Sequence, residues 1–150
     1  MTKEEYLSQI QVLSRRIDYH NERLLRLQRQ ADAVTSRWGE HSSSASGDAP
    51  YVRMLENIEA AREELEEETG LLLSLQRQVE DTVNALPDER LRLVLLYHYL
   101  EKKTFAEIGE MLYVSFSSVR RYIIRALELL VLPEHPISIF PEKLVTVEQK

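Results

Sequence analysis

Residues 115–126 combine side chains that suit nucleic-acid recognition, with short polar residues preceding three arginines. Ser115 is positioned to cap a helix. One set of apolar residues recurs at the spacing of a helix packed along one side: Val119, Tyr122, Ile123, Ala126, Leu127 and Leu130. The opposite side would present Ser117, Ser118, Arg120, Arg121 and Arg125. Polar residues on a first turn and arginines beyond it are typical of a helix that enters the DNA major groove.

A shorter helix is predicted immediately before this one. Thr104 is a candidate N-cap, and Phe105, Ile108, Met111 and Leu112 share one helical face. Gly109 lies where the two helices must approach closely, which favours a small residue. Tyr113 occupies a turn position where many such turns have glycine. The stretch 104–132 therefore predicts a helix-turn-helix. The alternative is the charged outer face of a helical bundle, but no acidic residue opposes the arginines between 115 and 127.

Charge is unevenly distributed along the 150 residues, which carry a net charge of −6. Residues 1–86 hold 10 basic and 16 acidic residues, whereas residues 87–132 hold 7 and 6. The acidity thus lies away from the predicted DNA-binding helix, although the overall field opposes nonspecific attraction to DNA. The chain has no cysteine, which excludes disulfides and thiolate sites, and no apolar run long enough to span a bilayer. The polar N-terminus is unlike a signal peptide, so we expect a cytoplasmic protein without membrane association.

The first 86 residues predict a long antiparallel two-helix coiled-coil hairpin with a polar loop at 39–50. One heptad seam runs through Tyr6, Ile10, Leu13, Ile17, His20, Leu24, Leu27, Ala31, Val34 and Trp38. A second, more polar seam runs through Leu55, Ile58, Arg62, Leu65, Thr69, Leu72, Gln76, Val79, Val83 and Leu86. We expect His20 to lie inside the pair against Thr69, and Glu63–Glu68 to lie near Arg23 and Arg26. Leu71, Leu73 and Leu75 fall off this seam and are our candidates for self-association as a homodimer.

Three segments follow from these patterns: a hairpin at 1–86, a helix-turn-helix unit at 87–132, and a tail at 133–150. Leu86-Pro87-Asp88-Glu89 marks the start of a helix over about 88–101 that is apolar on nearly all sides. Such a helix belongs to a core shared with the two helices after it. The tail contains three prolines and is expected to be extended, with Ile137, Ile139 and Phe140 available for docking. The predicted fold class is all-α.

No pattern favours catalysis or a bound cofactor. The consecutive glutamates in Glu63–Glu68 point in different directions around a helix, so they are expected to form a solvated face rather than a metal site. The four histidines fit no ligand spacing, and Tyr97-His98-Tyr99 diverge around a helix. We predict that the protein is not an enzyme and has no cofactor or metal.

Residues 86–132 resemble region 4 of sigma-70-type transcription factors. The resemblance rests on the Leu-Pro-acidic start, Thr104-Phe105-x-Glu107-Ile108, Ser115-x-x-x-Val119-Arg120-Arg121, and Arg125-Ala126-Leu127. With the N-terminal hairpin included, the chain is similar to sigma-region-4-like proteins of phages and mobile elements of Gram-positive bacteria, related to ArpU-like late transcription regulators. That wider similarity covers about 1–132. It implies a promoter-like site in double-stranded DNA and contact with RNA polymerase.

The resemblance implies roles for particular side chains. Ser117, Ser118, Arg120 and Arg121 would face bases and phosphates, and Arg125 would face phosphate. Lys102, Lys103 and Thr104 would contact the DNA backbone. The leading hypothesis is a phage or prophage transcription regulator, with Ser115–Ala126 reading DNA. Two alternatives stay open: an adaptor of RNA polymerase or a sigma factor with little DNA contact, and a small-terminase-like DNA-packaging protein.

Overall fold

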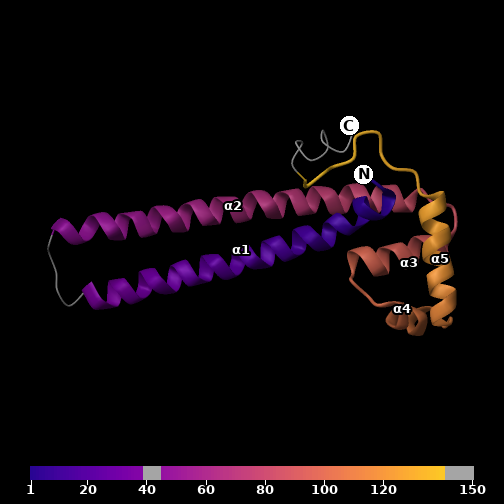
Figure 1. Cartoon of the computed structure of the whole chain (residues 1–150), viewed down its shortest axis with the longest axis horizontal. Helices are drawn as coiled ribbons and strands as arrows, with labels where there is room; N and C mark the ends of the chain where they lie inside the picture. Colours follow the sequence, from indigo (N-terminus) through magenta and orange to yellow (C-terminus); the bar gives the residue numbers. More distant parts are fainter. Residues whose placement is uncertain (39–44, 141–150) are drawn as a thin grey trace. The chain divides into compact units, whose positions relative to one another are not determined.

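The computed structural model describes residues 1–38 and 45–140, and it is helical without strands over those residues. Six helical elements follow one another: α1 (Lys3–Trp38), α2 (Ala45–Asn84), α3 (Glu89–Leu95), η1 (Leu96–Leu100), α4 (Phe105–Leu112) and α5 (Phe116–Leu129) (Figure 1). The all-α prediction is confirmed. Among the described residues, none of these helices combines the length and apolar character needed to cross a membrane.

The chain forms two compact units whose boundaries cross both long helices. One unit contains 14–71, and the other contains 1–13 together with 72–150. The predicted hairpin at 1–86 and helix-turn-helix unit at 87–132 divide the chain elsewhere. The grouping follows from burial, because the first turns of α1 and the last turns of α2 contribute to the same core as α3, α4 and α5.

In unit 14–71, α1 and α2 pack antiparallel through small and branched apolar residues (Figure 1). Ala31, Ile58 and Ala61 are buried, and Ile17, Leu24, Leu27, Val34 and Leu65 are half-buried. Ion pairs join the helices, with Arg16 Nη2 3.2 Å from Glu68 Oε2 and Arg23 Nη1 3.4 Å from Glu64 Oε2. The expected approach of the glutamates to Arg23 is therefore present. His20 lies 3.8 Å from Glu64, which corrects the predicted pairing with Thr69.

The first seam lies as predicted as far as its side chains are described, since its residues from Tyr6 to Val34 are buried or half-buried. The second seam was wrong at Leu55, Arg62 and Thr69, which are exposed. Gln76 is half-buried, and the residues that precede Arg62, Thr69 and Gln76, namely Ala61, Glu68 and Leu75, lie further inside. Each of these inner residues comes one position before the residue that was predicted to face α1. Ala61 is small enough to let the two helices approach, whereas an arginine at that position would hold them apart. The acidic Glu68 lies inward because Arg16 pairs with it.

This shift also changes the predicted self-association set. Leu75 is fully buried within its own chain, so it cannot contact a second copy from the surface, and its assignment is corrected. Leu71 is half-buried, while 62% of Leu73 is exposed. Leu73 borders an open surface hollow lined by Ser74, Arg77, Gln78, Asp81 and Ile137. Leu73 is therefore the only member of the predicted set with a largely exposed side chain.

The loop predicted at 39–50 was wrong for 45–50, because α2 begins at Ala45 and includes Pro50. Residues 39–44 lie outside the described residues. Pro50 is the sixth residue of α2, and because proline lacks a backbone N–H it removes one intrahelical hydrogen bond there. The helix nevertheless continues to Asn84. The serine, glycine and proline content at 45–50 therefore predicted a loop where the chain is helical.

The second unit joins the start of α1 and the end of α2 to the C-terminal helices. Side chains of α1 donate hydrogen bonds to η1 and α5, from Gln11 to the His98 carbonyl and from Lys3 to the Glu128 carbonyl, and α4 packs on η1 and α5. Its buried side chains come from every element: Tyr6, Leu7, Ile10, Leu13, Leu75, Val79, Val83, Leu86, Leu91, Val94, Leu95, Tyr99, Ile108, Val119, Ile123, Ala126, Leu130 and Ile139. Burial raises the pKa of Tyr99 to about 12, with the Glu4 carboxylate adding to the shift. The predicted helix at 88–101 is confirmed, except that its last turn, η1, is a π-helix.

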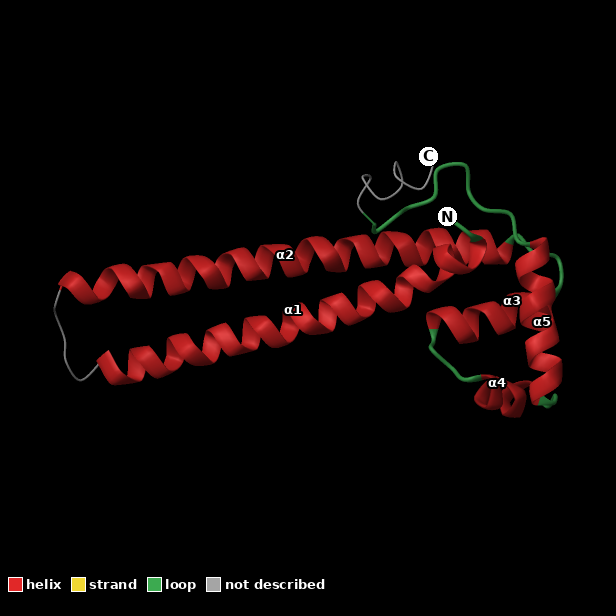
Figure 2. Cartoon of the chain, viewed as in Figure 1, coloured by secondary structure: helices red, strands yellow, loops and turns green. Residues whose placement is uncertain are grey.

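After α5 the chain continues without regular structure to Phe140 (Figure 2). Two glutamines hold its backbone. Gln9 is fully buried; its Nε2 donates to the Ile137 carbonyl at 2.9 Å and its Oε1 accepts from the Ile139 N–H at 2.9 Å. Gln78 accepts from the Ile137 N–H at 2.9 Å and donates to the His135 carbonyl at 3.1 Å. Ile139 is buried and Ile137 half-buried, as expected for docking, but 43% of Phe140 is exposed.

Candidate nucleic-acid interface

Two reciprocal hydrogen bonds fix the start of α4. The Thr104 hydroxyl accepts from the Glu107 N–H, and the Glu107 carboxylate accepts from the Thr104 N–H, each at 3.2 Å. This capping box satisfies two backbone donors that the helix leaves without partners. It also lowers the pKa of Glu107, since the hydrogen bonds favour the charged carboxylate. Thr104 was predicted to contact the DNA backbone; its hydroxyl and N–H already serve the helix start.

The turn between α4 and α5 requires a close approach and a left-handed residue. A Cβ added to Gly109 would lie 2.8 Å from the carbonyl oxygen of Val114, so a larger residue would force the turn to move. The predicted need for a small residue here is therefore met in the structure. Tyr113 ends α4 with φ 58° and ψ 43°, a conformation that glycine adopts more readily. Tyr113 holds it with a side chain that is 94% exposed.

Helix α5 has one buried face and one polar face. Val119, Ile123, Ala126 and Leu130 are buried, and Tyr122 and Leu127 are half-buried, as the apolar spacing predicts. These residues pack toward α3 and α4. Ser115, Ser117, Arg120, Arg121 and Arg125 are exposed. The fold therefore directs the arginines of this helix to solvent.

Ser115, Ser118 and Arg121 form a connected group on the first two turns of α5. The Ser115 hydroxyl accepts from the Ser118 N–H at 3.1 Å and donates to the Ser118 hydroxyl at 2.9 Å. Arg121 Nη2 in turn donates to Ser118 Oγ at 3.1 Å. Ser118 is half-buried, so it orients Arg121 more than it offers a surface of its own. One guanidinium N–H is used in this contact, and the other four remain for a ligand.

The two other arginines have fewer constraints. Arg125 Nη1 lies 3.4 Å from Glu128 Oε2, and both side chains are more than half exposed. Exposed pairs of this kind contribute little energy, so phosphate could displace the glutamate. Within the described residues, Arg120 has no ion pair or side-chain hydrogen bond. Arg120 and Arg125 are therefore available to an anionic partner.

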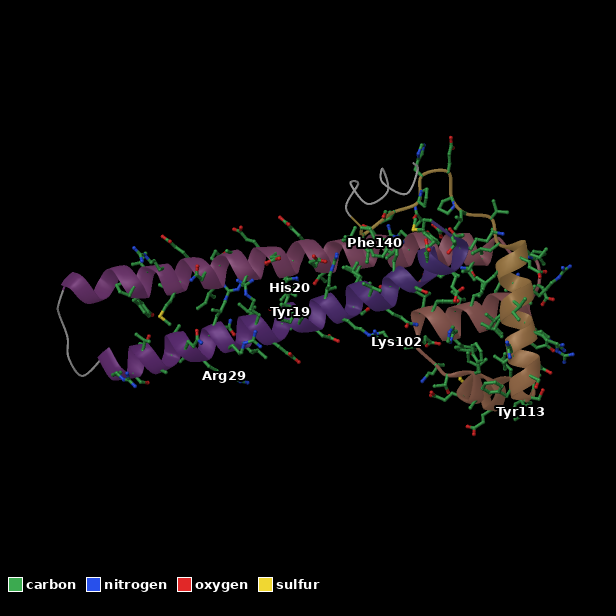
Figure 3. All side chains as sticks on the ribbon, viewed as in Figure 1. Tyr19, His20, Arg29, Lys102, Tyr113 and Phe140 are labelled. Carbon is green, nitrogen blue, oxygen red and sulfur yellow. The ribbon has the colours of Figure 1, made fainter. Side chains whose placement is uncertain are left out.

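The predicted backbone-contact residues Lys102 and Lys103 form the turn that leads into α4. Lys102 is exposed and has a left-handed φ of 58°. The Lys103 N–H donates to the Tyr97 carbonyl at 2.9 Å, and its carbonyl oxygen lies 3.0 Å from His98 Nδ1. Figure 3 shows Lys102 and Tyr113 at opposite ends of α4. The lysines thus belong to the other end of this helix from the start of α5.

One exposed residue on the first turn of α5 is absent from the predicted site. Phe116 is 57% exposed and lies between the cap Ser115 and Ser117. Its ring packs edgewise on Phe105, with the ring centroids 5.5 Å apart. Phe116 lies three residues before Val119 and seven before Ile123, so helical spacing alone places it on the buried stripe. Its exposure at the end of that stripe was therefore not readable from the spacing.

Residues 86–130 match the family model described as Sigma-70, region 4. No curated protein and no solved structure matches the chain. The matched segment begins at Leu86, after the end of α2, and includes all of α3, η1, α4 and α5. This part of the chain is a sigma-region-4-like helix-turn-helix, and the similarity supports a DNA-binding regulatory role.

Proposed function

We propose that this protein binds a promoter-like site in double-stranded DNA and regulates transcription, with α5 lying in the major groove. The observation that carries the proposal is the exposed row of Arg120, Arg121 and Arg125 on a helix whose other face is buried against α3 and α4. Arginine binds both guanine edges and phosphates, so one row can supply specificity and affinity. The match to Sigma-70, region 4 supports the same role.

The net charge of −6 constrains how this binding would work. The long-range field of the chain repels DNA, so affinity must come from short-range contacts of the α5 surface. We therefore expect a modest number of phosphate contacts and a strong preference for the correct sequence over random DNA.

Selection of bound fragments from a random duplex library tests the proposal and supplies the site. Replacing Arg120 and Arg121 together with alanine should weaken binding at least tenfold and make the slope of log affinity against log salt shallower by about 1 for each lost phosphate contact. The matched control is Arg77→Ala, an exposed arginine on α2. Equal affinity and slope for the double variant and the parent, with unchanged helical content, would contradict DNA reading by α5.

We also propose that the protein is a homodimer, because a single helix-turn-helix offers few base contacts and a second half-site raises affinity. Leu73 is our contact residue, because 62% of it is exposed whereas Leu71 is half-buried. Light scattering should give a dimer mass for the parent and a monomer mass for Leu73→Glu. The control is Leu25→Glu, which changes another exposed leucine, on α1, and should leave the mass unchanged. A monomeric parent would refute the dimer, and a ring-sized mass would favour the packaging alternative.

The remaining parts of the proposal concern partner and origin. The region-4 match favours RNA polymerase as a protein partner, and the resemblance to phage regulators leads us to propose a phage or prophage source. Copurification with polymerase in the absence of DNA, retained in the double arginine variant, would favour the adaptor alternative over direct reading of DNA.

A further inference from the structure

Phe116 combines high exposure with a fixed orientation. Although 57% of the residue is exposed, its ring packs against Phe105, with a centroid distance of 5.5 Å and an interplanar angle of 61°. Phe105 is half-buried and packs on the His98 ring at 4.9 Å. His98 in turn lies against the Lys103 carbonyl at 3.0 Å. This row of rings holds Phe116 at the surface, so little conformational freedom would be lost if a partner covered it.

The exposed neighbours of Phe116 along α5 are polar and cationic. Ser117 follows it directly, and Arg120 is one helical turn later on nearly the same side of α5. Both are exposed, and no acidic residue occurs from Ser115 to Leu127. A partner that fits this surface must be anionic around its edges and apolar where it meets the ring.

The DNA major groove has that combination. Phosphates line its edges, and the 5-methyl group of thymine is the apolar group that a base pair presents within it. Phenylalanine is among the side chains that contact this methyl group. We propose that Phe116 contacts the 5-methyl group of a thymine and so makes α5 specific for a site with thymine at that position. This inference rests on the proposed DNA binding and adds a specificity-determining residue to it.

Replacing thymine with deoxyuridine removes the methyl group and leaves base pairing intact, which provides a direct test. The probes are duplexes of the selected site, remade with deoxyuridine at one thymine position at a time. Burial of one methyl group corresponds to about fourfold in affinity. The parent should therefore lose about fourfold at one or two positions and nothing elsewhere.

Protein variants assign the effect to the ring. Phe116→Gln should bind the thymine and deoxyuridine probes equally, whereas Phe116→Leu, which keeps an apolar contact, should retain most of the preference. Leu129→Ala is the matched control, since it truncates another exposed apolar residue of α5 about 20 Å along the helix axis. Thermal unfolding of each variant checks that the loss of ring packing has not unfolded the unit.

The possible outcomes separate this inference from the proposed function. Salt-dependent DNA binding without any deoxyuridine effect in the parent would overturn the thymine contact and leave DNA binding standing. A preference that is unchanged in Phe116→Gln would also overturn it, because another residue would then contact the methyl group. Loss of self-association in Phe116→Gln without loss of DNA affinity would assign the ring to a protein interface. Failure of the parent to bind any duplex would refute both proposals.

Discussion

Gln9 offers the sharpest test of how the C-terminal segment is held. It is fully buried on α1, yet its amide bonds with backbone groups 128 and 130 residues away, at Ile137 and Ile139. The test substitution is Gln9→Leu, which keeps the side-chain volume close to that of glutamine and removes the bonds to Ile137 and Ile139, together with a 3.2 Å bond to the Tyr6 carbonyl within α1. The Ile139 N–H and the Ile137 carbonyl would then lose their partners.

Two responses are available to the variant. If the segment stays docked, two backbone groups lose their partners in a buried setting, at about 1–3 kcal/mol each. If it detaches, the main loss is the burial of Ile139, worth about 2 kcal/mol. The two lost bonds to Gln78, at about 0.5–1.5 kcal/mol each, are at least offset by the conformational entropy that the released residues regain. Detachment is cheaper, so we expect a loss of no more than about 2 kcal/mol in unfolding free energy.

Urea unfolding and amide hydrogen exchange measure the two parts of this expectation. The urea concentration at the midpoint of unfolding should fall by up to about 1 M, and hydrogen exchange at the Ile139 amide should become fast. Gln11→Leu is the matched control, since Gln11 makes a single longer bond of 3.3 Å to the His98 carbonyl. In a chain ending at residue 132, Gln9→Leu should cost almost nothing. A parent-like midpoint with slow exchange at Ile139 in the full-length variant would refute the reasoning.

Three further predictions concern the helix-turn-helix and one exposed glycine. Gly109→Ala should destabilise the protein by about 1–3 kcal/mol in urea unfolding because its Cβ would meet a backbone oxygen at 2.8 Å, whereas Gly70→Ala, with nothing within 4 Å, should stabilise it by about 1 kcal/mol. Tyr113→Gly should raise the melting temperature, since its φ of 58° costs a tyrosine about 1 kcal/mol and its exposed ring buries little; a lower melting temperature would contradict this. The pKa of Glu107 is lowered in the fold by its hydrogen bonds with Thr104, so its contribution is complete above the ordinary pKa of 4.5 and is lost as pH falls through the lowered value. The stability difference between the parent and Glu107→Gln should therefore shrink in acid, and a difference independent of pH would contradict the capping assignment.

Local signals predicted the helix-turn-helix well. Thr104 and Ser115 cap helices that begin at the next residue in each case, because a capping side chain needs only a donor two or three residues ahead. The buried face of α5 also followed from spacing, since Val119 and its apolar partners recur at helical period. These features depend on a few neighbouring residues and are readable without the rest of the fold.

The register of α2 was harder to predict because several registers satisfy the same sequence. Leu71, Leu72, Leu73 and Leu75 offer apolar residues on different sides of the helix. Alanine is common on both buried and exposed helix faces, so Ala61 gave no signal of burial. Glu68 is charged and would normally be predicted on the exposed face. Its inward position depends on Arg16, 52 residues away, so no window along α2 contains the deciding contact.

The α5 site was predictable from the sequence in part, whereas the contacts that hold the C-terminal segment were not. The arginines of α5 were predictable because charge on a helix face is a local property. Phe116 was missed because a phenylalanine is normally assigned to a core, and its exposure depends on the packing of Phe105 beneath it. The role of Gln9 was also hidden, since an amide on a heptad helix carries no periodic signal for a backbone partner far along the chain.

The acidic residues of 1–86 and the arginines of α5 together affect how the protein would distinguish its DNA site from other sequences. A chain of net charge −6 gains little from nonspecific attraction, so random DNA would compete weakly for it. Discrimination then depends on contacts that only the correct bases provide. Arg120 and Arg121 could bind phosphate on any sequence, but a ring fixed by Phe105 gains contact only where a methyl group meets it. If both proposals hold, raising the salt concentration should weaken binding to all duplexes while leaving the ratio between thymine and deoxyuridine probes unchanged, because a methyl contact releases no counterions. A ratio that falls toward one as salt rises would show that the preference is electrostatic, and it would remove the thymine contact from the account of specificity.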